Sequence, residues 1–94
     1  MPDYPLVMIE WVDAFGCSTD WREMDNLDTE SLLCRSVGWL VHDGDGVKVI
    51  VPHMAEERRE RTSIQGCGDM SIPAVSVTQI ITLSREPQAA HEGE

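Results

Sequence analysis

Two β-rich runs around an Asp-Gly turn constrain the fold of this chain more than any other feature. Residues 36–42 and 47–53 are rich in Val, Ile and Trp, and Asp43-Gly44-Asp45-Gly46 separates them. An Asp-Gly turn between such runs is the strongest short-range signal for a β-hairpin. With Gly44 and Asp45 at the centre of the turn, the predicted partners are His42 and Val47, Leu40 and Val49, Trp39 and Ile50, and Gly38 and Val51.

Both faces of this hairpin are apolar. Because side chains alternate along a strand, one face carries Gly38, Leu40, Val47, Val49 and Val51. A surface hairpin normally shows one polar face, so either the rest of the chain or a partner covers the second side. That second side also carries Lys48. The candidate protein-binding residues on this second side are Trp39, Ile50, Val37 and Val41. Burial inside the domain is an equally good explanation for their apolar character.

Charge limits the partners that this chain can have. The 94 residues include 17 acidic and 7 basic side chains, which gives a formal net charge of -10. That charge opposes binding to phosphate backbones and anionic membranes, so we expect neither direct nucleic-acid binding nor a membrane partner. No apolar run approaches the roughly 20 residues of a membrane-spanning helix. Three widely spaced cysteines without a secretory signal favour a reduced, cytoplasmic protein.

Three further strands complete the predicted fold. Residues 6–14, 69–72 and 78–83 are β-rich, with Trp11 as a core anchor in the first run, and a single 3₁₀ turn over residues 73–77 joins the last two. With strands at 32–41 and 47–51, they predict an all-β domain over residues 1–84, a small five-stranded SH3-like barrel. The alternative is an OB-like barrel, which needs a helix over residues 54–61. Residues 85–94 lack apolar periodicity and are predicted to be a disordered acidic tail.

Residues 17–31 form a polar, acidic segment. We expect a long ordered loop or one or two turns of helix there. Trp21, Met24 and Leu27 have the spacing i, i+3, i+6, which would pin a short helical turn to the body of the domain. The carboxylates would suit a basic protein partner or imitate nucleic-acid phosphates, whereas a solvated loop is the commoner reason for such a run. The carboxylates offered as a binding surface are Asp20, Glu23, Asp25, Asp28 and Glu30.

No motif for catalysis, a cofactor or a metal stands out. In the predicted register His42 and His53 lie five residue pairs apart at about 3.3 Å each, so they cannot share a metal ion. Cys17, Cys34 and Cys67 have no base placed beside them by any sequence signature, which leaves them without the partner that a nucleophile needs. We therefore expect a protein without cofactor or metal that is not an enzyme.

A series of short motifs runs through residues 6–83. In order they are Ile9-Glu-Trp-Val-Asp-Ala, Ser36-Val-Gly-Trp-Leu-Val, the Asp-Gly turn, Val49-Ile-Val-Pro-His and Gly68-Asp-Met-Ser-Ile-Pro, followed by Ile80-Ile81. This combination resembles a group of small proteins encoded by bacteriophages and prophages. The resemblance implies a phage origin and a compact β fold, and it supplies no catalytic residues.

These observations lead to one expected function and one alternative. The first is a non-enzymatic, phage-encoded protein that binds a host protein in the bacterial cytoplasm and inhibits a defence or regulatory component. The alternative is a structural or assembly module of a phage that forms a homo-oligomer through the Trp39 face or by edge-strand pairing.

Overall fold

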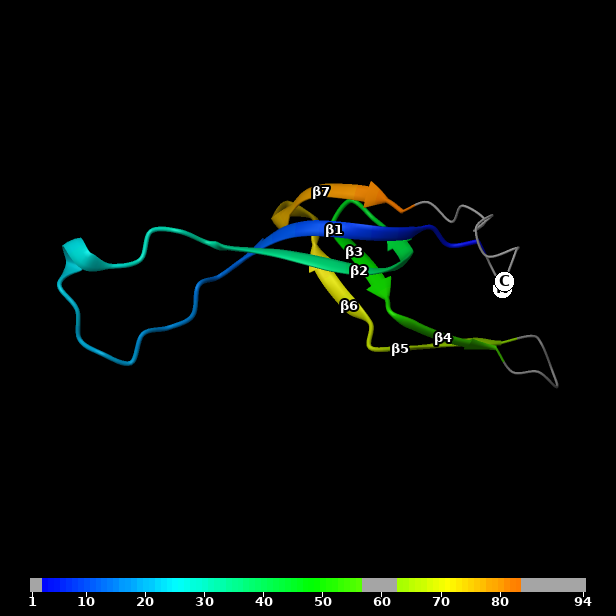
Figure 1. The fold of residues 1–94 in the computed structure, drawn as a ribbon, viewed down its shortest axis with the longest axis horizontal. Helices are drawn as coiled ribbons and strands as arrows, with labels where there is room; N and C mark the ends of the chain where they lie inside the picture. The colour runs from blue at the N-terminus through cyan, green and yellow to red at the C-terminus, as the bar shows by residue number, and fades with distance from the viewer. Residues whose placement is uncertain (1–2, 57–62, 84–94) are drawn as a thin grey trace, which may run out of the picture.

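The computed structural model describes residues 3–56 and 63–83, and within them the chain is mainly β, with two 3₁₀ helices and no α-helix (Figure 1). The predicted tail, residues 85–94, lies outside the described residues. The elements are β1 (Leu6–Asp13), η1 (Met24–Asn26), β2 (Leu32–Asp43), β3 (Val47–Val51), β4 (His53–Glu56), β5 (Ile64–Cys67), β6 (Met70–Pro73), η2 (Ala74–Ser76) and β7 (Val77–Thr82).

Five strands form one antiparallel sheet in the order β6-β3-β2-β1-β7, and β4 and β5 form a separate two-stranded sheet. The five strands of the large sheet and the 3₁₀ turn before the last of them were predicted, and the structure confirms them. The β4–β5 ribbon was not predicted. Only Pro52 separates β4 from β3. Most of the ribbon is exposed, so it lacks the apolar periodicity that marks a strand in sequence.

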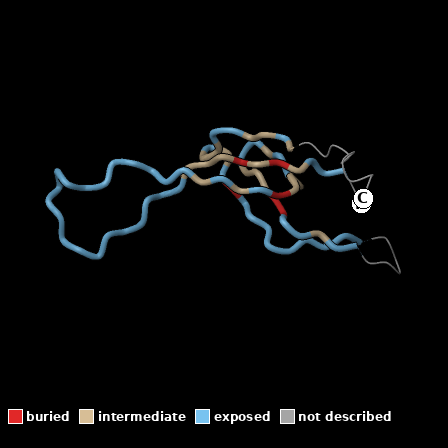
Figure 2. The backbone as a smooth tube through the Cα atoms, viewed as in Figure 1, coloured by how far each residue is buried: buried red, intermediate tan, exposed pale blue. Residues whose placement is uncertain are grey.

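The core lies on one face of the large sheet. Val7, Ile9, Ile50 and Ile72 are buried there, each no more than 2% exposed. Trp11 packs against this cluster as predicted, and its indole Nε1 donates a hydrogen bond to Ser36 Oγ at 3.0 Å. Leu40, Val77 and Ile80 complete the packing. Figure 2 shows how few positions are buried and that they concentrate in this sheet.

The predicted register of the central hairpin is wrong. Asp43 pairs with Lys48 and His42 with Val49, so the connection is longer than a two-residue turn. Lys48 Nζ lies 2.6 Å from Asp43 Oδ1, and Gly44 N–H donates to the Val47 carbonyl at 3.1 Å. A bulge between Leu40 and His42 then shifts the pairing by one residue, so that Leu40 faces Ile50 and Trp39 faces Val51.

A second irregularity lies between β1 and β7. Glu10 pairs with Gln79 but Trp11 pairs with Val77, which leaves Thr78 as the extra residue on β7. The Thr78 hydroxyl donates to the Glu10 carbonyl at 3.1 Å. This side-chain bond occupies an acceptor at the point where the backbone ladder is interrupted.

The helix required by the OB-like alternative does not form over the part of residues 54–61 that the structure describes. Met54, Ala55 and Glu56 belong to β4 and pair with Gly66, Gln65 and Ile64 of β5. Residues 57–62 lie outside the described residues.

We predict that Ile9→Ala lowers the free energy of unfolding by about 2–5 kcal/mol, because it opens a cavity in a core of few side chains. Urea unfolding measures the loss. Val75→Ala is the control, since Val75 is 95% exposed and should change stability by less than about 0.5 kcal/mol. Equal midpoints for the two variants would contradict this account of the core.

Gly38 and Gly46 provide a second test of the packing. A Cβ on Gly38 would lie 3.1 Å from the carbonyl carbon and oxygen of Val51, whereas a Cβ on Gly46 meets nothing within 4 Å. We expect Gly38→Ala to cost about 1–3 kcal/mol by overpacking and Gly46→Ala to be close to neutral, both by urea unfolding. A Gly38→Ala variant as stable as Gly46→Ala would show that β3 does not approach β2 this closely.

Candidate functional site

Residues 14–31, here called the acidic arm, connect β1 to β2 and extend away from the sheet (Figure 1). Every residue of the arm is exposed (Figure 2). The predicted turn exists as η1, but its pinning to the body is wrong. Trp21 is 103% exposed, Met24 80% and Leu27 44%.

Local polar contacts hold the arm in shape. Arg22 forms an ion pair with Asp28 at 3.2 Å, and the Ser18 hydroxyl donates to the Asp20 carbonyl at 3.2 Å. At the tip, Asn26 N–H donates to the Glu23 carbonyl at 2.9 Å. Folding the arm back onto the sheet would remove water from its carboxylates without giving them basic partners, which is costly. The arm therefore stays extended despite its apolar side chains.

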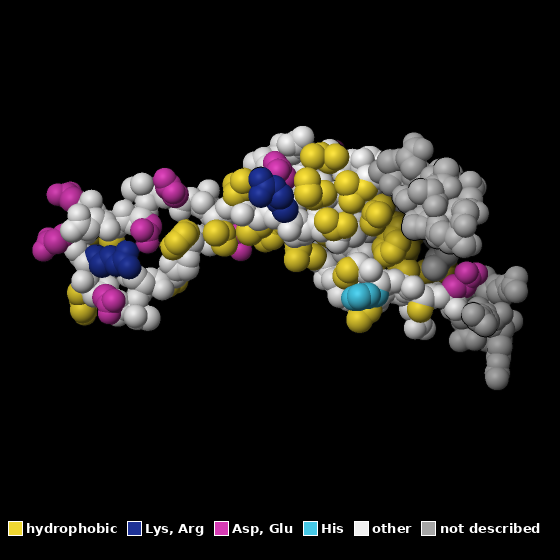
Figure 3. All heavy atoms as spheres, in the orientation of Figure 1, with side chains coloured by type: hydrophobic (Ala, Val, Ile, Leu, Met, Phe, Trp, Pro, Cys, Tyr) yellow, Lys and Arg dark blue, Asp and Glu magenta, His cyan; other side chains and the backbone are white. Residues whose placement is uncertain are grey.

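Large apolar side chains are exposed along the arm and at the start of β2. Besides Trp21, Met24 and Leu27, the arm exposes Phe15 at 56%, and β2 exposes Leu32 at 46% and Leu33 at 50%. In Figure 3 apolar side chains alternate with carboxylates along this part of the molecule. Apolar groups gathered in one region of a surface mark an interaction site more often than scattered ones do. The arm and this end of β2 are therefore the best candidate for a binding surface.

The sequence analysis did not predict three of these exposed apolar side chains, those of Phe15, Leu32 and Leu33. The signal for the two leucines was available, because adjacent apolar residues on a strand point to opposite faces and only one of them can enter a core. Phe15 lies two residues after the end of β1 and precedes the polar segment, so nothing in its surroundings distinguished it from the end of a buried strand.

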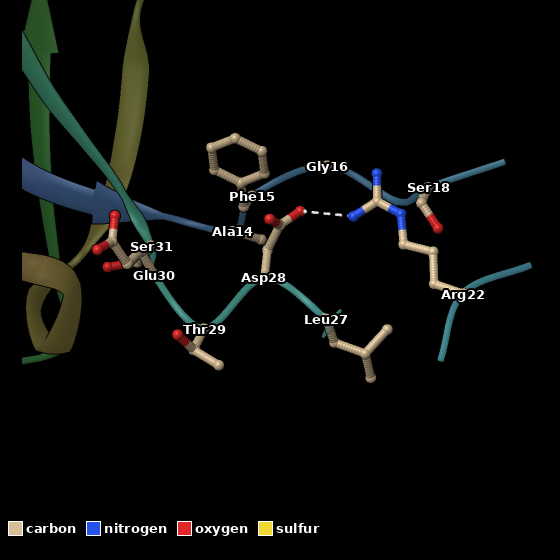
Figure 4. A pocket seen from close by; sticks show the side chains of 10 residues that line it. All are labelled: Ala14, Phe15, Gly16, Ser18, Arg22, Leu27, Asp28, Thr29, Glu30 and Ser31. Carbon is tan, nitrogen blue, oxygen red and sulfur yellow. Dashed lines mark hydrogen bonds and ion pairs between the residues drawn. The ribbon is translucent and has the colours of Figure 1, made fainter. Parts of the chain in front are cut away.

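The arm encloses an open hollow of about 440 Å³ (Figure 4). Phe15 and Leu27 supply its apolar lining, and the Arg22–Asp28 ion pair crosses it. Its hydroxyl groups come from Ser18, Thr29 and Ser31, and the lining contains no histidine, lysine or cysteine.

The predicted apolar patch around Trp39 is divided between the two faces of the sheet. Ile50, 2% exposed, is a core residue and cannot bind a partner. Trp39 and Val41 are half-buried, whereas Val37 is 52% exposed. The predicted patch failed because the changed register at the turn and the bulge at Val41 together place Ile50 opposite Leu40 instead of Trp39.

The five predicted carboxylates all lie on the arm and are all exposed. Asp28 is paired with Arg22. No ion pair joins any of the other four to a residue within the described ranges; they are Asp20, Glu23, Asp25 and Glu30.

The described residues contain no group of three or more His, Cys, Asp or Glu side chains placed to hold a metal ion. His42 and His53 are both exposed. Cys17 and Cys67 are exposed free thiols, and Cys34 is a half-buried one. Over the part of the chain that is described, no helix has the length and apolar character needed to cross a membrane.

No protein-family model matches the chain, and comparisons with curated proteins and with solved structures give no match. The candidate site therefore rests on its own geometry. That geometry offers exposed aromatic and aliphatic side chains among unpaired carboxylates, a combination suited to binding.

We predict that Trp21→Phe removes most of the acrylamide-quenchable tryptophan fluorescence, because Trp21 is fully exposed while Trp11 packs against the core. Trp11→Phe is the matched control and should leave the quenchable component in place. The free energy of unfolding should change by less than about 0.5 kcal/mol in Trp21→Phe. Protected Trp21 fluorescence in the purified protein would mean that the arm is folded onto a surface.

Proposed function

We propose that this protein is a non-enzymatic binding module whose acidic arm docks on a basic, partly apolar surface of a host protein. The observation that carries the proposal is the exposure of Trp21 and Met24 among carboxylates of which only Asp28 forms an ion pair within the described residues. Binding would inhibit the host component by covering its surface.

The apolar side chains of the arm would supply much of the affinity. Burying one side chain of this size contributes about 1.5–3 kcal/mol. Tryptophan is also enriched among the residues whose truncation costs most at protein interfaces. Trp21, at 103% exposure, has its whole surface available for such burial.

The carboxylates would select the partner. Five of them lie on the arm against one basic side chain, Arg22, which Asp28 already neutralises. A basic surface on the partner would speed encounter and reject acidic competitors. Because exposed charges are screened by salt, association should weaken as ionic strength rises.

The proposal extends to origin, location and fold. The resemblance to phage and prophage proteins suggests a host protein in the bacterial cytoplasm, which the free thiols suit. The strand order and the position of η2 between β6 and β7 support an SH3-like barrel. A self-assembling module is the second candidate function. It is favoured by the edge of β2 over residues 32–38, which pairs with β1 on one side and with no described strand on the other.

Affinity capture from lysate of a bacterial host, followed by binding measurements on the purified pair, tests the proposal. Trp21→Ser with Met24→Ser should weaken binding at least tenfold, and so should Glu23→Gln with Asp25→Asn and Glu30→Gln, which keeps the Arg22–Asp28 pair. Val75→Ser is the matched control, because Val75 is as exposed as the arm residues but lies on η2.

The pattern across variants decides the outcome. Binding that survives in Val75→Ser, is lost in the arm variants and falls with added salt supports the proposal. A captured protein that binds all variants equally would contradict it, because the contact surface would then lie outside the arm.

A further inference from the structure

The first half of β2 has an unpaired edge. β2 pairs with β1 from Leu32 to Trp39, but its pairing with β3 begins only at Trp39 and runs to Asp43. Over residues 32–38 no strand within the described ranges lies on the side away from β1. An open edge of this length is a template for another strand.

The backbone groups at this edge can be identified. Leu40 N–H donates to the Pro5 carbonyl at 2.8 Å, so the backbone hydrogen-bonding groups of Leu40 point toward the β1 side of β2. Because backbone direction alternates along a strand, the N–H and C=O groups of Leu33, Arg35 and Val37 point to the open edge. Trp39 is the next alternate residue after Val37, so its backbone groups should point to the same side. It pairs with Val51 of β3 on that side, which agrees with the assignment.

β3 leaves this edge open for a physical reason. After Val51 and Pro52 the chain enters β4, which pairs with β5 in another sheet, so no described residue after Val51 continues alongside β2. The edge is also accessible, because Leu33 is 50% and Val37 52% exposed and Arg35 is exposed.

We propose that two copies of this chain pair antiparallel through these edges, with the two-fold axis at Arg35. Leu33 of each copy then faces Val37 of the other, and Arg35 faces Arg35. All three residues direct both backbone groups at the partner, so the contact forms about six hydrogen bonds. The paired side chains lie on the outer face of the sheet, opposite the core.

Residues 33–37 of β2 are self-complementary in this register. The pairing places apolar Leu33 beside apolar Val37 at both ends, and places uncharged Cys34 beside Ser36 on the other face. Arg35 is held by Glu10 of its own chain at 2.8 Å, so the two guanidinium groups meet as members of neutralised pairs. This match within one sequence is the reason to assign the edge to a second copy rather than to an unrelated strand.

The net charge of -10 opposes this dimer and makes its formation depend on ionic strength. Two like-charged copies repel, and salt screens the repulsion. Self-association should therefore strengthen with ionic strength, whereas binding of the acidic arm to a basic protein should weaken. The contact is small, so the dimer is expected to be reversible and concentration-dependent.

Sedimentation velocity on the purified chain tests the proposal, from micromolar concentration to about 1 mM, the weak end of measurable association. The wild type should shift from monomer to dimer, and more readily at higher salt. Leu33→Lys with Val37→Lys should raise the dissociation constant at least tenfold, because charges at an edge oppose pairing. Met24→Lys with Val75→Lys is the control, since it makes the same charge change at exposed apolar sites elsewhere.

Val37→Pro provides a second variant that tests the backbone. It removes an N–H that points to the open edge and is not used by β1, so circular dichroism should remain that of the folded chain while the dimer is lost. A wild type that is monomeric at every concentration and salt would overturn the proposal. So would a dimer that persists in both edge variants.

This dimer is independent of the proposed host interaction, and the two can fail separately. Val37→Pro, which changes no residue of the arm or of the start of β2 that adjoins it, should abolish self-association and retain arm-dependent capture. Trp21→Ser with Met24→Ser should do the reverse.

Discussion

The packing of β1 against its neighbours is the interaction on which the rest of the structure depends. β1 is paired on both sides, with β2 and with β7, and its inward residues Val7 and Ile9 lie at the centre of the core. Ile50 and Ile72 reach the same cluster from β3 and β6. Since side chains alternate, burying this face leaves the outer face of β1 and β2 to solvent or to partners.

Much of the fold follows from local sequence, because strand alternation and the Pro73 turn are local signals. The strands of the large sheet, the core role of Trp11 and the position of η2 were all predictable for that reason. The hairpin register was not. A bulge at Val41 and a loop closed by Lys48 and Asp43 depend on contacts between strands, and an error of one residue exchanges the faces of the sheet.

The acidic charge of the candidate site could be predicted from the sequence, but the exposure of its apolar side chains could not. The carboxylates of the arm are visible in sequence, and their exposure follows from hydration. The spacing of Trp21, Met24 and Leu27 suggested packing on the body, because apolar periodicity is usually explained by a core. The structure shows the opposite, since all three side chains are exposed. The cost of dehydrating the neighbouring carboxylates accounts for this exposure.

The arm and the edge of β2 are compatible surfaces. In an antiparallel dimer about Arg35, the paired segment of each copy ends at Leu33, opposite Val37 of the other, because Val51 occupies the edge beside Trp39. The two arms therefore leave the shared sheet at opposite ends. This arrangement separates the most acidic parts of the two chains, which lowers their repulsion. It also leaves both arms free.

A host protein with two basic sites would then meet two linked arms, and the second contact would form at a high effective concentration. The open edge of β2 would in this way convert a weak single contact into a bivalent one.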